Sequence, residues 1–188
     1  MASWPKNYAY SYGHRDSFGF TWDSTGQLWA AEDGPSCVDE INKIEAGANY
    51  GWGPLSAAAN GDESKPCKGK MPYNTNKDGV NITLPVWYWP ADTKTSQGLR
   101  PPAPTGIAAC ISCGVEEIEG QALMGSFNAA NLQLINIANP PSQSTEVVKP
   151  RVVHDNKGLP ILAVEACPSG TIFFTDATGT IYKVTEPA

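Results

Sequence analysis

Two short polar segments in the first quarter of the chain contain the residue types best suited to ligand chemistry. The first is His14-Arg15-Asp16. An arginine guanidinium can grip a carboxylate or a quinone oxygen through paired hydrogen bonds. The same side chain could instead form a salt bridge to Asp16 or Asp33, and the residues alone leave both roles open.

The second segment is the corner Asp33-Gly34-Pro35, which is followed closely by Asp39 and Glu40. Such a corner can present consecutive backbone carbonyls, and hard oxygen ligands of this kind suit Ca²⁺. For the two carboxylates that follow, the alternative is a pair of solvated groups at the edge of a strand. Calcium is therefore the metal that this segment favours.

The densest aromatic cluster is Pro85-Val86-Trp87-Tyr88-Trp89-Pro90. Aromatic faces pack well against both sugar rings and flat cofactors, so the cluster could form a stacking wall that includes Trp89. The alternative is a strand that packs on its neighbour in the fold. The residues alone do not separate a binding wall from a packed strand.

Five cysteines are many for a chain of 188 residues. Cys37 and Cys67 bracket the Tyr50-Gly51-Trp52 segment and could staple it with a disulfide. Such a bridge would place the protein in an oxidising compartment, which means outside the cell or in the periplasm.

Cys110 and Cys113 have the spacing of a redox or metal half-site. A zinc site needs about four ligands, and His14 and His154 are the only histidines of the chain. We therefore expect a structural disulfide rather than a metal site. Because the number of cysteines is odd, one of them must remain without a partner in the chain.

Strands and turns must position these residues. Apolar and aromatic runs at residues 18–22 and 28–31 flank a turn-forming cluster at 23–26, which predicts a hairpin. Residues 40–44 alternate polar and apolar side chains with the period of two expected of a half-buried strand. Together these segments predict an antiparallel meander.

The same order of apolar run, turn and apolar run recurs twice. One copy covers residues 164–176 with a strand at 180–184, and a weaker copy covers 122–127 and 132–137. Repeated meanders predict the blades of a β-propeller, with hairpin-rich sandwiches as the alternative. At about 40–45 residues per four-stranded blade, the chain has room for three to four blades. We expect one all-β domain over residues 1–188, with loop excursions near 54–84 and 91–102.

Composition supports a globular domain rich in sheets and loops and excludes two classes of partner. The chain has 41% hydrophobic residues, 18 glycines and 16 prolines. Its net charge of −6 excludes a nucleic-acid partner, since phosphate binding needs a concentrated basic face. No apolar run approaches the ~20 residues of a membrane span, and the first residues do not form a signal peptide. We therefore expect an internal start, an expression product or a split gene.

Four segments together resemble the soluble quinoprotein sugar dehydrogenases of the glucose/sorbosone dehydrogenase family. They read GHRDSFGF, AAEDGPSCVDEINKIEAGANYGWG, PVWYWP followed by APTGI, and GTIFFTDATGTIYKV. The resemblance covers almost the whole chain but only the C-terminal half of the family's six-bladed propeller. It implies oxidation of aldose sugars at C1 with pyrroloquinoline quinone (PQQ) and calcium. The family's general base, a histidine, belongs to the N-terminal half, which this chain does not match.

The resemblance also assigns roles to individual residues. Arg15 matches the arginine that contacts the C5 quinone oxygen of PQQ, and the segment that contains Trp89 borders the substrate cleft. The carbonyls at Gly34 and Pro35 match those that hold the calcium which polarises the quinone. A second, structural calcium uses positions that match Asp39, Glu40 and Tyr50.

Several positions depart from the family pattern. Asp16 stands where the family has asparagine, which replaces an amide donor with a carboxylate that only accepts. Asn128 replaces a cofactor-binding lysine, and Pro160 and Leu162 replace two arginines that clamp cofactor carboxylates. Each lost charge-assisted hydrogen bond is worth about 1.5–3 kcal/mol, so we expect this chain alone to bind PQQ weakly or not at all.

Two hypotheses of different class follow. The first is the C-terminal part of a calcium- and PQQ-dependent sugar dehydrogenase, whose base would come from a companion N-terminal half-propeller chain. The second is a non-catalytic propeller module that keeps calcium for rigidity and associates through its faces or open edges, for example as a homo-oligomer. The matches at Arg15 and Gly34-Pro35 favour the first hypothesis, whereas the lost cations and the missing base favour the second.

Overall fold

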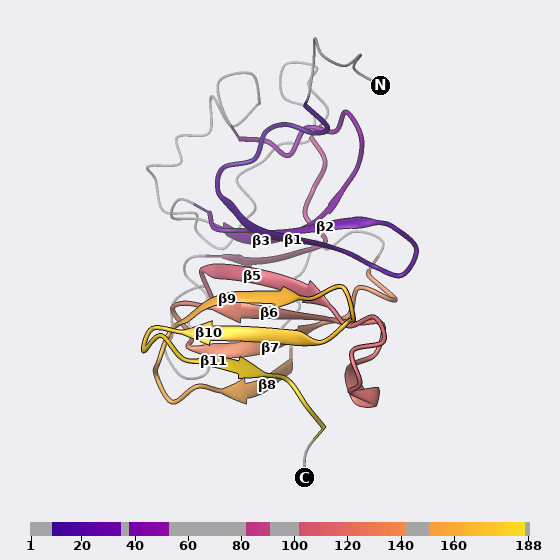
Figure 1. The fold of residues 1–188 in the computed structure, drawn as a ribbon. Helices are drawn as coiled ribbons and strands as arrows, with labels where there is room; N and C mark the ends of the chain where they lie inside the picture. The colour runs from indigo at the N-terminus through magenta and orange to yellow at the C-terminus, as the bar shows by residue number, and fades with distance from the viewer. Residues whose placement is uncertain (1–8, 35–37, 53–81, 91–101, 142–150, 187–188) are drawn as a thin grey trace.

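The computed structural model describes residues 9–34, 38–52, 82–90, 102–141 and 151–186 (Figure 1). In this part of the chain the β-strands form three antiparallel sheets in which the strands follow one another in chain order. The first sheet contains β1 (Ser17–Trp22), β2 (Leu28–Glu32), β3 (Val38–Ile44) and β4 (Trp87–Pro90). The second contains β5 (Pro104–Ala109), β6 (Ala122–Ser126), β7 (Asn131–Ile135) and β8 (Arg151–Asp155). The third contains β9 (Ile161–Ala166), β10 (Ile172–Asp176) and β11 (Ile181–Lys183).

The three sheets meet along their first strands. β5 contacts both β1 and β9, and the remaining strands of each sheet extend away from this line of contact (Figure 1). In a propeller blade, consecutive strands are likewise placed in order from the inner to the outer position. The all-β propeller prediction is confirmed: the described residues form three sheets, two of four strands and one of three, where three to four four-stranded blades were expected.

Most strands lie where the sequence predicts them, but β5 and β8 do not follow from it. β5 reads Pro-Thr-Gly-Ile-Ala-Ala, and proline, glycine and alanine are all depleted in strands. Its small residues allow the neighbouring sheets to approach it on both sides, so packing overrides the local preference. A single turn of 3₁₀ helix, η3 (Glu116–Ile118), lies between β5 and β6.

Two apolar clusters hold the sheets together. One lies between the first and second sheets and includes Trp29, Trp87 and Met124. The other lies between the second and third sheets and includes Leu123 and Val164, with further members Leu132, Ile161, Ile172 and Phe174. Each sheet therefore buries the side chains of alternate residues against its neighbour.

The structure corrects the prediction that residues 40–44 form a half-buried strand. Glu40 is 4% exposed and Asn42 is 0% exposed, although both carry polar side chains. The outer face of the first sheet is covered by Tyr50, which packs with Ala30 and Ile44 in a third cluster. The alternation of polar and apolar residues in β3 therefore separates two buried faces rather than a buried face from a solvated one.

The predicted hairpin turn after β1 is confirmed, and its chemistry recurs after β10. The Asp23 carboxylate accepts hydrogen bonds from the Thr25 N–H and hydroxyl at 2.8 and 2.6 Å. The Asp176 carboxylate accepts the same pair from Thr178 at 2.9 and 2.6 Å. Both turns read Asp-x-Thr-Gly, and an aspartate that bonds the backbone two residues later is a frequent way to form a turn.

The cysteines follow the prediction where the structure describes them. Cys110 and Cys113 form a disulfide, which confirms the expected structural bridge, and Cys167 is a free thiol. Cys37 and Cys67 lie outside the described residues, as does most of the two predicted loop excursions. No helix among the described residues is long and apolar enough to cross a membrane.

A backbone contact at Gly106 sets the distance between the second and third sheets. A Cβ atom at this position would lie 2.6 Å from the Val164 nitrogen and 3.0 Å from its carbonyl oxygen. Gly106→Ala should therefore lower the free energy of unfolding by about 1–3 kcal/mol, because the backbone of β9 must move. Urea unfolding measures the change. An unchanged free energy of unfolding in Gly106→Ala would contradict the assigned contact.

The buried Asp176 carboxylate gives stability a pH dependence. Hydrogen bonds from the Thr178 hydroxyl, and then from Tyr182, lower the pKa of Asp176 from 3.8 to about 2. Its contribution is complete above the unfolded pKa and is lost as the pH falls through about 2. Asp176→Asn should lower the melting temperature at neutral pH and flatten the decline between these two pKa values. Thermal unfolding across pH tests this, with the exposed Asp155→Asn as control; an unchanged decline in Asp176→Asn would contradict it.

Candidate functional site

The Glu32 carboxylate, at the C-terminal end of β2, organises the segment that precedes β1. Its side chain accepts hydrogen bonds from the Arg15 N–H, from His14 Nδ1 at 3.0 Å and from the Ser17 hydroxyl at 3.3 Å. Glu32 is 5% exposed, so these donors replace the water that the carboxylate loses on burial. The consequence is a fixed backbone position for Arg15.

His14 connects this segment to the outer face of the first sheet. Its Nε2 lies 2.8 Å from the Ser11 hydroxyl, and its ring stacks on Tyr50 with centroids 4.6 Å apart. The Tyr50 hydroxyl donates to the Lys43 carbonyl at 2.6 Å and accepts from the Glu45 N–H at 2.9 Å. Burial raises the pKa of Tyr50 to about 12. The Tyr50 hydroxyl is therefore neutral and already makes two hydrogen bonds. The group that Tyr50 could offer to a metal is its main-chain carbonyl.

The Arg15 side chain lies at the mouth of the Asp33 corner. Its Nη1 donates to the Asp33 carbonyl at 2.7 Å and to the Asp33 carboxylate at 3.1 Å. Its Cζ also lies 5.8 Å from the centroid of the Trp52 ring. The structure therefore forms the salt bridge to Asp33 and not the alternative to Asp16. Both partners of this bridge are 29% exposed, so the pair is worth at most about 1 kcal/mol and a ligand anion can compete for Arg15.

Asp39 fastens the same corner to the second sheet. Its carboxylate accepts the Gly34 N–H at 3.1 Å and the Ala103 N–H at 2.7 Å, and Asp39 is 4% exposed. Burial raises the pKa of Asp39 to about 7; the Ala103 N–H opposes this rise, and the charge of Asp33 adds to it. Among the described residues no lysine or arginine bonds Asp39 itself, so these two neighbouring carboxyl groups form an environment that a cation would stabilise. Pro35, the other predicted carbonyl donor, lies outside the described residues.

A second group of oxygens lies on the outer face of the first sheet. Glu40 stands directly opposite Glu32 in the β2–β3 register, and both are buried. The Asn42 amide donates to the Glu40 carboxylate at 3.0 Å, and the Asn42 Oδ1 is buried without a hydrogen-bond partner among the described residues. Like charges directly opposite on a sheet are destabilising unless a cation or a proton compensates them. Carboxylate and amide oxygens are the donors that Ca²⁺ prefers.

The structure separates two carboxylates that the resemblance places at one calcium. Asp39 and Glu40 are consecutive in β3, so their side chains point to opposite faces of the sheet. Glu40 shares its face with Glu32 and Tyr50, whereas Asp39 joins Asp33 and Gly34. The alternative of solvated strand-edge carboxylates does not hold, because Asp39 and Glu40 are each 4% exposed.

The remaining predicted residues have different environments. Trp89 is 6% exposed and belongs to the cluster between the first and second sheets, which corresponds to the packed-strand alternative for this aromatic segment. Asp16 is exposed and its carbonyl accepts the Asp33 N–H at 3.0 Å. Leu162 is 44% exposed, so the family's arginine position here carries an apolar side chain on the surface.

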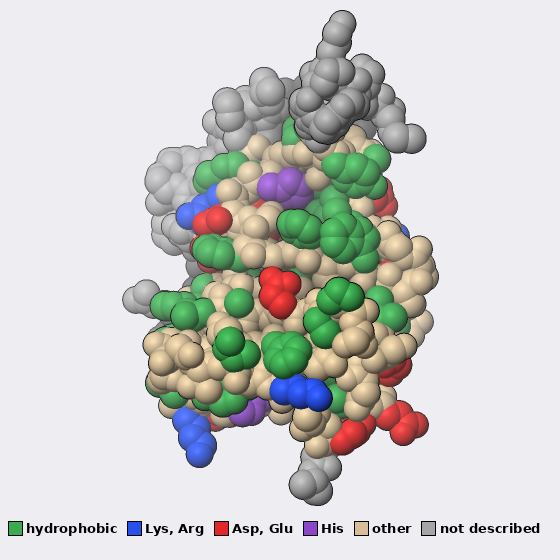
Figure 2. Space-filling model, viewed as in Figure 1, with side chains coloured by type: hydrophobic (Ala, Val, Ile, Leu, Met, Phe, Trp, Pro, Cys, Tyr) green, Lys and Arg blue, Asp and Glu red, His purple; other side chains and the backbone are tan. Residues whose placement is uncertain are grey.

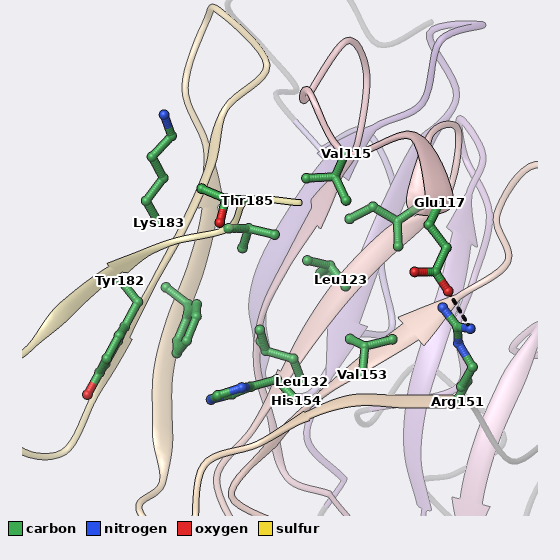
Figure 3. A pocket seen from close by; sticks show the side chains of 13 residues that line it. Val115, Glu117, Leu123, Leu132, Arg151, Val153, His154, Tyr182, Lys183 and Thr185 are labelled. Atoms are coloured by element: carbon green, nitrogen blue, oxygen red, sulfur yellow. Dashed lines mark hydrogen bonds and ion pairs between the residues drawn. The ribbon is translucent and has the colours of Figure 1, made fainter. Parts of the chain in front are cut away.

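A cavity of about 310 Å³ lies elsewhere, between the outer strands of the second and third sheets (Figure 3). Apolar residues such as Leu123 and Leu132 line it, together with His154 and Tyr182. The Arg151–Glu117 ion pair, with its nitrogen and oxygen 2.8 Å apart, lies on the wall of this cavity. None of the residues predicted for cofactor or metal binding lines this cavity.

Sequence reasoning missed two residues of the site. Glu32 joins the 14–17 segment to β2, and Trp52 packs beside Arg15. A signal for Glu32 was present, because an acidic residue closes the apolar run Leu-Trp-Ala-Ala. Trp52 carried no local signal, since its contact depends on how the loop after β3 folds back.

Comparisons with known proteins agree with this architecture. The family model described as glucose/sorbosone dehydrogenase matches residues 3–183. The aldose sugar dehydrogenase YliI of Escherichia coli is 26% identical over 181 residues, which cover 93% of this chain and 43% of that protein. The chain therefore spans less than half the length of this curated relative.

Solved structures share the fold at low sequence identity. A structure titled glucose dehydrogenase superposes with a TM-score of 0.66 at 24% identity and covers 96% of this chain and 46% of its own. The PQQ-bound aldose sugar dehydrogenase of Streptomyces coelicolor has a TM-score of 0.56 at 24% identity, covering 91% and 40%. A calcium structure of a Trichoderma reesei carbohydrate-active enzyme has a TM-score of 0.54 at 17% identity, covering 92% and 52%.

These structures show that the three sheets correspond to about half of a propeller dehydrogenase. The family model supplies the identity, because it matches nearly the whole chain, from the segment before β1 to the end of β11. The chain belongs to the glucose/sorbosone dehydrogenase family.

Proposed function

We propose that this chain is the C-terminal part of a calcium- and PQQ-dependent dehydrogenase that oxidises aldose sugars at C1. The observation that carries the proposal is the position of Arg15, whose backbone is fixed by Glu32 and whose guanidinium stays partly exposed beside a buried acidic corner. Membership of the family and the PQQ-bound relative support the choice of cofactor.

The acidic residues fit calcium. On one face of the first sheet the donors would be Glu40, the Asn42 amide oxygen and the Tyr50 carbonyl. At the corner they would be Asp39 and the Gly34 carbonyl, to which the family resemblance adds the carbonyl of Pro35. Hard oxygen donors of mixed charge at both places are suited to calcium rather than to zinc. Calcium would also relieve the repulsion between the opposed carboxylates of Glu32 and Glu40.

The fit to PQQ is narrower and rests on Arg15. When bound, the quinone would supply the acceptor for the two electrons that leave the sugar C1. Arg15 would exchange its bonds to Asp33 for a quinone oxygen and stabilise the negative charge that develops there. Trp52 beside the guanidinium would limit the directions in which Arg15 can turn. The base that takes the sugar hydroxyl proton would come from the N-terminal half of the ring, supplied by a companion chain.

A non-catalytic calcium-stabilised module is the second candidate. It is favoured by Asn128, Pro160 and Leu162, which stand where the family has cations for a trianionic cofactor. In this case Arg15 remains paired with Asp33 and closes the acidic corner. The Cys110–Cys113 disulfide supports, for either candidate, a location outside the cell or in the periplasm.

Quinone binding separates the two candidates. Under the enzyme proposal, the ring completed by the companion half binds PQQ in the presence of calcium, and Arg15→Ala weakens this affinity about ten- to hundredfold, because charge-assisted hydrogen bonds are lost. Fluorescence titration with PQQ measures the affinity. Arg151→Ala, which removes an exposed arginine paired with Glu117, is the matched control and should bind like the wild type. Equal affinities of the wild type and Arg15→Ala would exclude the assigned quinone contact.

The calcium proposal predicts that Glu40→Gln reduces the stabilisation that calcium gives. Added calcium should raise the melting temperature of the wild type above its value in chelator buffer, since a ligand stabilises the state that binds it. The rise should be smaller in Glu40→Gln, because a charged oxygen ligand is lost. Differential scanning calorimetry gives both comparisons, with the exposed Glu45→Gln as control. A calcium-induced shift that survives intact in Glu40→Gln would refute a calcium ligand at this position.

A further inference from the structure

A bulge in β8 shapes one wall of the cavity between the second and third sheets. The pairing of β8 with β7 shifts register after Leu132, which leaves Val153 as an extra residue on β8. In a regular strand, residues three apart point to opposite faces, but the extra residue turns Arg151 and His154 to the same face. These two side chains and Val153 therefore all line the cavity.

The interior of the cavity is mainly aliphatic. Its aliphatic lining comes from the turn before β6, from β6, β7 and β8, and from the segment after β11: Val115, Ile118, Leu123, Leu132, Val153 and Val184 (Figure 3). The volume of about 310 Å³ is at the lower end of the ~300–1,000 Å³ of small-molecule sites. The cavity therefore suits a small ligand with an aliphatic body, because burial of apolar surface favours binding.

The walls of the cavity are fixed by bonds within the chain. The Cys110–Cys113 disulfide holds the segment before η3. The Glu116 N–H at the start of η3 donates to the Glu186 carboxylate, and the Val184 N–H donates to a carbonyl of β10 at 3.0 Å. A ligand therefore meets a formed cavity, which lowers the cost of ordering the protein on binding.

Most polar side chains of the lining are bonded to other residues or point elsewhere. The Tyr182 hydroxyl donates to the Asp176 carboxylate at 2.9 Å. His154 Nε2 lies 3.3 Å from the Asn156 Oδ1. The Lys183 side chain extends away from the other labelled side chains (Figure 3). We therefore assign none of these groups to the head of a ligand.

Arg151 is the polar residue that can receive a ligand. Its guanidinium carries five N–H donors, and Nη1 donates to the Glu117 carboxylate at 2.8 Å. The two side chains are 54% and 59% exposed, so this ion pair is weak and leaves donors for a second acceptor. Figure 2 shows Lys or Arg side chains and a histidine beside hydrophobic side chains at the end of the molecule where β8 and β11 lie in Figure 1. A carboxylate fits a guanidinium through two parallel hydrogen bonds.

The lining does not suit a sugar. Sugar rings stack on open aromatic faces. The Phe174 ring is 6% exposed, because His154 and Tyr182 pack against it with centroids 5.4 and 4.7 Å away. Phe174 therefore offers no open face, and the remaining apolar lining is aliphatic.

We propose that this cavity binds a small aliphatic monocarboxylate of the medium-chain fatty acid class. The carboxylate accepts hydrogen bonds from Arg151, and the hydrocarbon chain lies against Leu123, Leu132 and Val153. Binding here does not depend on the proposed dehydrogenase activity, because the lining contains none of the residues assigned to PQQ or calcium.

Titration of the full chain with octanoate, followed by NMR of the backbone amides, tests the proposal. Saturable shifts should appear at residues 115–118 and in β8, with a Kd of about 1 mM or tighter for a ligand of this size. Octylamine has the same chain and a cationic head, so it should bind at least about tenfold more weakly. Shifts that do not saturate, or that lie away from the cavity, would overturn the site.

Two neighbouring valines of β8 give matched variants. Val153→Trp places a large side chain in the cavity and should abolish octanoate binding. Val152→Trp is the control, since Val152 is 51% exposed and does not line the cavity, and it should bind like the wild type. The amide spectrum of each variant shows whether it is folded. Octanoate binding that survives in folded Val153→Trp would overturn the assigned cavity.

Arg151→Met tests the head group. This variant keeps an apolar stem of similar length, so it should bind octanoate about tenfold more weakly and lose the preference for octanoate over octylamine. Octanoate affinity that is unchanged in Arg151→Met, or equal affinities of the wild type for the two ligands, would overturn the carboxylate assignment.

Discussion

The close approach of the innermost strands is the constraint on which the rest of the structure depends. Gly19 and Gly106 have no side chain beyond Cα, so the backbones of β1, β5 and β9 can come into contact and the sheets radiate from one line. The clusters around Trp29 and Val164 fill the space between the sheets as they diverge. Within the first sheet, the pairing of β1 with β2 brings the segment before β1, where Arg15 lies, beside the end of β2 and the acidic corner.

Buried charge is the second feature that links the fold to a function. Glu32, Asp39 and Glu40 are each at most 5% exposed, a location that carboxylates rarely occupy without partners. His14, the Arg15 N–H and the Ser17 hydroxyl compensate Glu32, and two backbone N–H groups bind Asp39. Opposed carboxylates on one face of the sheet and a raised pKa of Asp39 on the other indicate sites that calcium would complete. The proposed calcium ions would compensate this buried negative charge.

The sequence predicted the sheets where hydrophobic periodicity was strong, as in β1, β2 and β10, and it predicted the turns where Asp and Gly mark them. It did not predict β5, because small residues chosen for inter-sheet contact have low strand propensity. At the site, motif residues such as Arg15 were identified from the sequence, and the structure adds that the side chains of Asp39 and Glu40 lie on opposite faces of β3. The role of Glu32 depends on three donors from another segment, and no pattern within β2 encodes them.

Native mass spectrometry of the protein purified from its own source, with calcium kept in the buffer, tests the account most directly. It reads the bound ions, the bound cofactor and the partner chains in one experiment. The account predicts a complex in which this chain retains calcium, carries the mass of PQQ and is joined to another half of the ring. A single chain of 20.1 kDa with neither calcium nor PQQ would contradict it.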